Sequence, residues 1–256
     1  MNNEVNNMGA SVQSVRWLAW ALVILAIGSA VLTLMLTFTI LVPPPPPDIE
    51  DLVPRLEATR LADQQIFPFV VLQSLLTLGV FLVTAMLGAV LRAWARPTTL
   101  RDVMVLVFVI GGVLGITANV INIGVAQAAS FGYCDCGFKT EELIAQDYAV
   151  RLVWTVVNWL SIAALTLTGV GVAIAGRLLD VSPAWRTLSF IIAAVIVGAA
   201  AIRVIAAFVF IQAFNPFQIS DLLIAAAAGI LVPIWAILLA GGIQGPEPDL
   251  AAPESY

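Results

Sequence analysis

The chain has 256 residues, of which 61% are hydrophobic and 11% charged, and its formal net charge at pH 7 is −5. An ordinary soluble domain has about 25% charged residues, so this composition is typical of a protein built for lipid. The acidic balance offers no basic surface for nucleic acid. The absence of histidine removes the usual haem ligand, the commonest imidazole ligand of zinc and the usual general base.

Six segments each offer more than the ~20 mostly apolar residues that a helix needs to cross a hydrocarbon core. None alternates like a barrel strand, and inside lipid each segment must satisfy its own backbone, which favours helix. We therefore predict an all-α integral membrane protein, a six-transmembrane-helix bundle within residues 15–244. The predicted spans are Trp17–Val42, Phe67–Leu91, Val103–Ala129, Ala149–Ala175, Leu188–Phe214 and Leu222–Ile243.

The arginines predict the orientation, because short cytoplasmic loops carry an excess of basic residues. One side of the membrane collects Arg16, Arg92, Arg96, Arg101, Arg177 and Arg186. The other side collects Arg55, Arg60, Lys139 and Arg151 among many acidic residues. Both termini are predicted to be cytoplasmic, in a multi-pass protein of a bacterial inner (plasma) membrane. The acidic outer side indicates a solvated rim, with a cation-attracting vestibule as the alternative.

Four segments outside the spans have compositions of their own. Residues Met1–Ser14 are poor in large apolar side chains, and residues 245–256 are rich in proline, so both ends are expected to be disordered tails. The run Pro43–Pro47 ends the first span as a stiff spacer. Apolar residues at helical spacing over Asp48–Gln65 predict a short amphipathic helix in the first outer loop.

Small residues and prolines mark positions within the spans. Pro68 is expected in the first turn of the second span. Gly111 and Gly115 have the G-x-x-x-G spacing of a helix-packing face. Pro233 predicts a kink in the last span.

The two cysteines, Cys134 and Cys136, lie in one outer loop. They are too few for a tetrahedral metal site, and no histidine completes one, so no metal is predicted. The alternatives are an incidental or structural pair, and a strained, easily reduced disulfide.

The fifth span carries Arg203 near its middle, where an arginine is costly unless it has a partner or water. Counting at 1.5 Å per residue brings polar residues of the other spans to a similar depth: Thr33, Gln73, Thr77, Asn119, Asn122, Thr155 and Asn158. The candidate partners of Arg203 are the asparagine oxygens, Asp221 and a bound small anion. The first reading is an interhelical polar network, and the second is a ligand-binding site for an anionic group.

Three functions follow as hypotheses. The first is a non-enzymatic membrane protein, a structural or accessory subunit of other membrane subunits or a small-ligand binder, using the polar layer around Arg203. The alternative is a transporter or channel for a small anionic or polar solute. The third is a thiol-redox protein of the envelope that uses Cys134 and Cys136. No cofactor is predicted.

Overall fold

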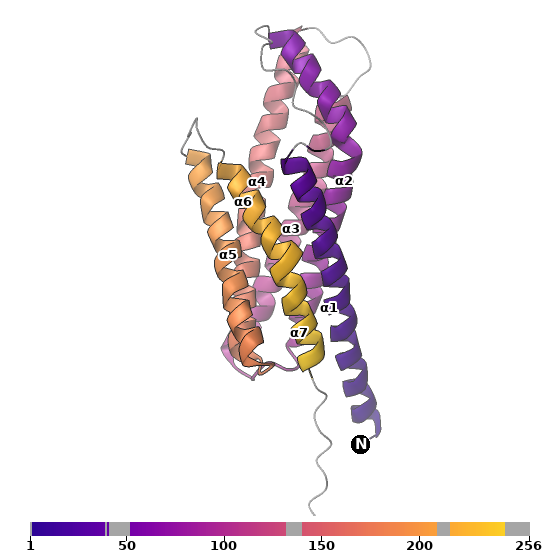
Figure 1. The fold of residues 1–256 in the computed structure, drawn as a ribbon, viewed down its shortest axis with the longest axis vertical. Helices are drawn as coiled ribbons and strands as arrows, with labels where there is room; N and C mark the ends of the chain where they lie inside the picture. The colour runs from indigo at the N-terminus through magenta and orange to yellow at the C-terminus, as the bar shows by residue number, and fades with distance from the viewer. Residues whose placement is uncertain (1, 39, 41–51, 132–139, 209–215, 244–256) are drawn as a thin grey trace, which may run out of the picture.

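The structure is a computed structural model that describes residues 2–38, 40, 52–131, 140–208 and 216–243. It is helical throughout its ordered elements (Figure 1), which are α1 (Asn2–Thr37), α2 (Leu52–Leu91), α3 (Thr99–Phe131), α4 (Thr140–Leu178), α5 (Pro183–Phe208), α6 (Pro216–Ala226), the π-helix η1 (Ala227–Leu231) and α7 (Val232–Gly242). Six helices in this part of the chain are long and apolar enough to cross a membrane, the last being formed by α6, η1 and α7 together. The predicted multi-pass helical bundle is confirmed.

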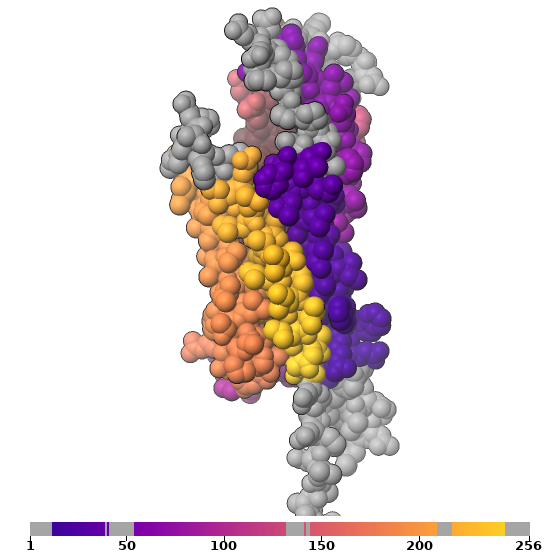
Figure 2. All heavy atoms as spheres, viewed as in Figure 1, coloured from indigo at the N-terminus to yellow at the C-terminus, as the bar shows by residue number. Residues whose placement is uncertain are grey.

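The six spans form a closed ring. Each span packs against its neighbours along the chain, and α1 packs against α6, η1 and α7. Figure 2 shows the last span lying in the seam between α5 and α1. The Arg16 Nε group of α1 also donates to the Ala240 carbonyl of α7 at 3.3 Å. The start of α1 and the end of α7 lie at one end of the bundle (Figure 1), which we call the terminal end, and the opposite end is the distal end.

The beginning of the chain differs from the prediction. The helix α1 begins at Asn2, so residues 2–14, expected as a disordered tail, continue the first span as helix. Once the apolar part of α1 has formed, each added residue costs little, because helix growth is far easier than helix nucleation. The expected tail at 245–256 and most of the proline run lie outside the described residues.

The helix α2 also differs from the prediction. Its 40 residues run without a break from Leu52, so the described part of Asp48–Gln65 extends the second span instead of forming a separate amphipathic helix. Pro68 lies inside this helix and not in its first turn. At 1.5 Å per residue α2 is about 60 Å long, roughly twice the hydrocarbon core of a bilayer. Figure 1 shows α2 and α4 continuing past the distal ends of α1, α5 and α6.

The distal extension of α2 is held by the end of α3. The last carbonyls of a helix have no partner within it, and two side chains of α2 supply one. Arg60 donates to the carbonyls of Ser130 and Phe131 at 3.2 and 2.8 Å, and Gln64 donates to Ser130 at 2.8 Å. The Phe67 and Phe131 rings meet edge to face, 5.1 Å apart. These contacts explain why the segment stays helical and close to α3.

Pro233 coincides with the irregular turn of the last span. The Val232 N–H donates to the Ala227 carbonyl, five residues back, as in a π-helix. A proline lacks the N–H that an α-helix needs, and neighbouring turns of altered pitch can take up the defect. The predicted irregularity is therefore present immediately before Pro233.

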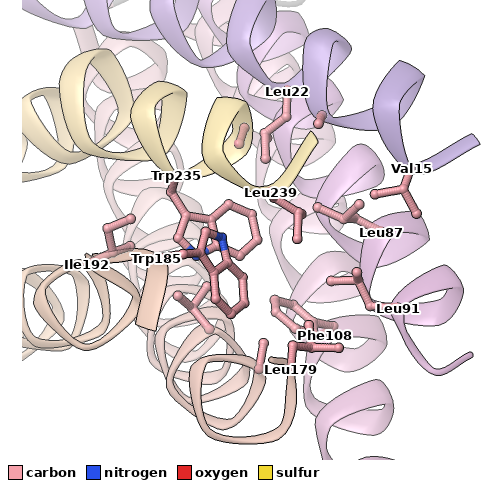
Figure 3. Close-up of a cluster of buried hydrophobic side chains, with 14 of the residues drawn as sticks. Val15, Leu22, Leu87, Leu91, Phe108, Leu179, Trp185, Ile192, Trp235 and Leu239 are labelled. Atoms are coloured by element: carbon pink, nitrogen blue, oxygen red, sulfur yellow. The ribbon is translucent and has the colours of Figure 1, made fainter. Parts of the chain in front are cut away.

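The core lies at the terminal end (Figure 3). The fully buried Trp185 of α5 stacks on Trp235 of α7 with ring centroids 5.3 Å apart. The Trp235 indole N–H donates to Ser189 Oγ at 2.8 Å. Phe108 and Leu87 complete the aromatic and aliphatic contact from α3 and α2. The terminal end is therefore closed by tight apolar packing.

Ion pairs join the loops at the terminal end. Asp180 accepts from Arg96 at 2.5 Å and from Arg186 at 3.1 Å. The hydrogen bond and charge of Arg96, with a smaller contribution from Arg186, lower the pKa of Asp180. Any stabilisation from this link is therefore present above the ordinary carboxyl pKa and lost as the pH falls through the lowered one. Because the groups are exposed, the contribution is small.

Glycines of α3 allow α2 and α4 to approach. A Cβ atom on Gly112 would lie 2.6 Å from the Ala85 Cβ and 3.1 Å from the Phe81 carbonyl oxygen of α2. A Cβ on Gly111 would lie 3.1 Å from Thr168 Oγ1 of α4. The small-residue face therefore contacts two neighbouring helices, and not one.

We predict that Gly112→Ala lowers the free energy of unfolding by about 1 to 3 kcal/mol, because the Ala85 Cβ can move away only with its backbone. Gly124→Ala on the same helix is the matched control, since a Cβ there would meet nothing within 4 Å. Thermal unfolding in detergent measures both. Equal melting temperatures for the two variants would contradict this account of the α2–α3 contact.

Candidate functional site: a cavity on the bundle axis

A cavity of about 450 Å³ lies between the six spans, and every one of them contributes to its lining. Its polar lining residues gather towards the distal half, and we call the following set the polar layer: Ser29, Thr33, Gln73, Thr77, Asn119, Asn122, Asn158, Arg203 and Asp221. Its other end is apolar and is formed by residues of the core: Leu22, Leu87, Phe108, Val172, Ile192, Ile196 and Trp235. Figure 3 shows this apolar end at the stacked tryptophans.

Hydrogen bonds between helices organise one side of the polar layer. The hydroxyls of Ser29 on α1 and Thr77 on α2 are 2.7 Å apart. Gln73 donates from α2 to Thr33 Oγ1 on α1 at 3.3 Å, and Asn122 donates from α3 to Ser74 Oγ at 3.1 Å. These bonds bring α1, α2 and α3 to a common level.

Arg203 joins α5 to α6 on the other side. Its guanidinium forms an ion pair with Asp221, and its Nε donates to Ser220 Oγ at 3.0 Å. The Ser220 hydroxyl donates in turn to the Ala199 carbonyl of α5 at 3.0 Å. The side chains of Arg203 and Asp221 are 19% and 31% exposed, so the pair is mostly enclosed. Of the partners considered from the sequence, the structure selects Asp221.

The asparagines do not reach Arg203. Asn119 donates to the Gly115 carbonyl of its own helix at 2.8 Å. Asn158 is 7% exposed and makes no hydrogen bond within the described part of the chain, although it lines the cavity. The expected four-residue network is therefore a pair extended by Ser220, with both asparagines separate from it.

Seven residues singled out from the sequence lie around one cavity: Gln73, Thr77, Asn119, Asn122, Asn158, Arg203 and Asp221. Sequence reasoning missed Ser29 and Ser220. Ser29 precedes Thr33 by one helical turn, a spacing that places both on one face, whereas nothing in the sequence singles out Ser220. Cys134 and Cys136 lie outside the described residues.

The charge of the polar layer follows from the ion pair. Arg203 and Asp221 are the charged side chains among the described residues that line the cavity, and they neutralise each other. An anion bound at Arg203 would have to displace Asp221 and leave a carboxylate unpaired in a place of low dielectric constant. The cavity is therefore suited to hydrogen-bonding groups without net charge.

We predict that Arg203→Gln and Asp221→Asn each lower the free energy of unfolding by roughly 2 to 3 kcal/mol, because each leaves a mostly enclosed charge without its partner. Asp180→Asn is the control, since it breaks ion pairs that are more than half exposed and costs little. Thermal or denaturant unfolding of the three variants measures the difference. A loss for Asp180→Asn as large as for the other two would contradict the prediction.

The described residues contain no group of three or more acidic or cysteine side chains placed to hold a metal ion. What the cavity offers is a set of amides and hydroxyls above an apolar end. No protein-family model, no curated protein and no solved structure matches this chain.

Proposed function

We propose that this protein is a non-enzymatic membrane protein that binds a small amphipathic molecule in the cavity on its axis. The observation that carries the proposal is the division of the lining into a polar layer and an apolar end. Ligand sites are typically concave and mostly apolar, with a few polar groups that orient the ligand. A volume of about 450 Å³ lies within the range of about 300 to 1,000 Å³ that such sites have.

The chemistry of the lining supports binding over catalysis. An arginine does not give up its proton in a protein, and Asp221 is committed to Arg203 by an ion pair. The remaining polar groups among the described lining residues are amides and hydroxyls. These groups orient a ligand, and none is a ready general acid or base.

The alternative hypothesis, transport of a small solute, places the same cavity on a path across the membrane. Such a path needs the Trp185–Trp235 stack and the residues around it to separate. These side chains are buried and packed together, which favours binding without passage.

The proposal includes the place of the protein in the cell. The distribution of arginines favours a bacterial inner membrane with both termini in the cytoplasm, so that the polar layer lies in the outer half of the bilayer. A reporter fused to the C-terminus is then active only in the cytoplasm. Activity on the outer side would reverse the orientation without touching the cavity.

We predict that Ala228→Leu removes most of the bound molecule, because Ala228 lines the cavity and a leucine there fills it. The matched control is Ala226→Leu, which adds the same atoms two residues away at an exposed position. Native mass spectrometry of protein extracted from its own membrane in mild detergent measures the fraction that carries an adduct. The proposal predicts an adduct on the wild type and on Ala226→Leu, and its depletion in Ala228→Leu. Equal adducts on the two variants, or none on the wild type, would contradict the proposal.

A further inference from the structure

The side chain of Asn158 has no structural partner. It is 7% exposed, yet its amide makes no hydrogen bond to any other described residue. Its neighbours in the polar layer differ, since Asn119 and Asn122 each donate at 3.1 Å or less. A buried polar group without a partner destabilises the folded state, so this amide contributes nothing to the bundle that a leucine would not.

The Asn158 amide faces the cavity. Asn158 lines the cavity on α4, between Trp154 on its distal side and Ser161 on its terminal side. Its nitrogen and oxygen are not among the fully enclosed atoms without a partner, unlike Thr168 Oγ1, which packs against Gly111. A molecule in the cavity can therefore reach the donor and the acceptor of Asn158.

The cavity is long. Its lining on α4 runs from Trp154 to Val172, which at 1.5 Å per residue is about 27 Å. Its lining on α2 runs from Val70 to Leu87, about 26 Å. A volume of about 450 Å³ spread over such a length makes the space slender, so it fits an extended chain better than a fused-ring molecule.

From these observations we infer that the ligand is an uncharged amphiphile with a single hydrocarbon chain, and that Asn158 binds its head group. The inference rests on the proposed function and names its ligand class. The amide of Asn158 donates to and accepts from a hydroxyl, ester or amide head. The chain extends past Leu165 and Val172 to Phe108 and Trp235 at the apolar end. A charged head is excluded because Arg203 and Asp221 are already paired with each other.

The experiment uses two probes that share one chain. Monoolein has an uncharged head with hydroxyl groups, and oleate has a carboxylate on the same hydrocarbon. Each is titrated into the full-length protein in phosphatidylcholine nanodiscs, and binding is followed by tryptophan fluorescence, because Trp154 and Trp235 line the cavity. Monoolein is expected to bind the wild type more tightly than oleate does.

The variant Asn158→Leu is expected to weaken monoolein binding about tenfold, the loss of roughly one hydrogen bond in an enclosed site. Without ligand, its melting temperature is expected to equal or exceed that of the wild type, because an unpartnered amide is removed. The matched control, Asn122→Leu, breaks the bond to Ser74 and is expected to lower the melting temperature. Asn158→Ala takes the place of the leucine variant if the latter does not fold.

The outcomes separate the inference from the proposed function. Unchanged monoolein binding in Asn158→Leu would overturn the role of Asn158 while leaving the binding function intact. Tighter binding of oleate by the wild type would overturn the uncharged ligand class. A lower melting temperature for both Asn158 variants, with unchanged binding, would make Asn158 structural. Failure of the wild type to bind either probe would overturn the proposed function together with the inference.

Discussion

The ion pair between Arg203 and Asp221 is the interaction on which the distal half of the bundle depends. An arginine at the centre of a membrane helix costs about 2.5 to 3.5 kcal/mol on insertion scales unless it is satisfied. Here α6 supplies both a carboxylate and, through Ser220, a hydroxyl that continues to the backbone of α5. The pair therefore fixes α6 against α5, and α6 in turn packs on α1 and closes the ring.

Two ways of holding helices together divide the bundle along its length. At the terminal end the aromatic stack of Trp185 and Trp235 and the close approach at Gly112 fill the axis with side chains. At the distal end the helices meet through hydrogen bonds such as Ser29 to Thr77, which need fewer atoms and leave the axis partly empty. The cavity, polar at one end and apolar at the other, is a consequence of this division.

The sequence predicted the features that depend on composition and depth. Hydropathy placed the six spans, and counting residues from the membrane surface brought Arg203 level with Asn119 and Asn158 and within reach of Asp221. It failed where tertiary contacts decide. Arg60 and Gln64 keep α2 helical by capping α3, and their partners are far away in the chain. Depth also cannot tell which residue is left without a bond, so Asn119, which bonds its own helix, and Asn158, which does not, looked alike.

A double-mutant cycle on Arg203 and Asp221 tests the central claim most directly. The cycle compares the unfolding free energies of Arg203→Gln, Asp221→Asn and the double variant with that of the wild type. If the two charges satisfy each other, the double variant is more stable than the sum of the single effects predicts, with a coupling of roughly 1 to 3 kcal/mol. Effects that add to within about 0.5 kcal/mol would mean that Arg203 is held by something other than Asp221, and would contradict a neutral cavity.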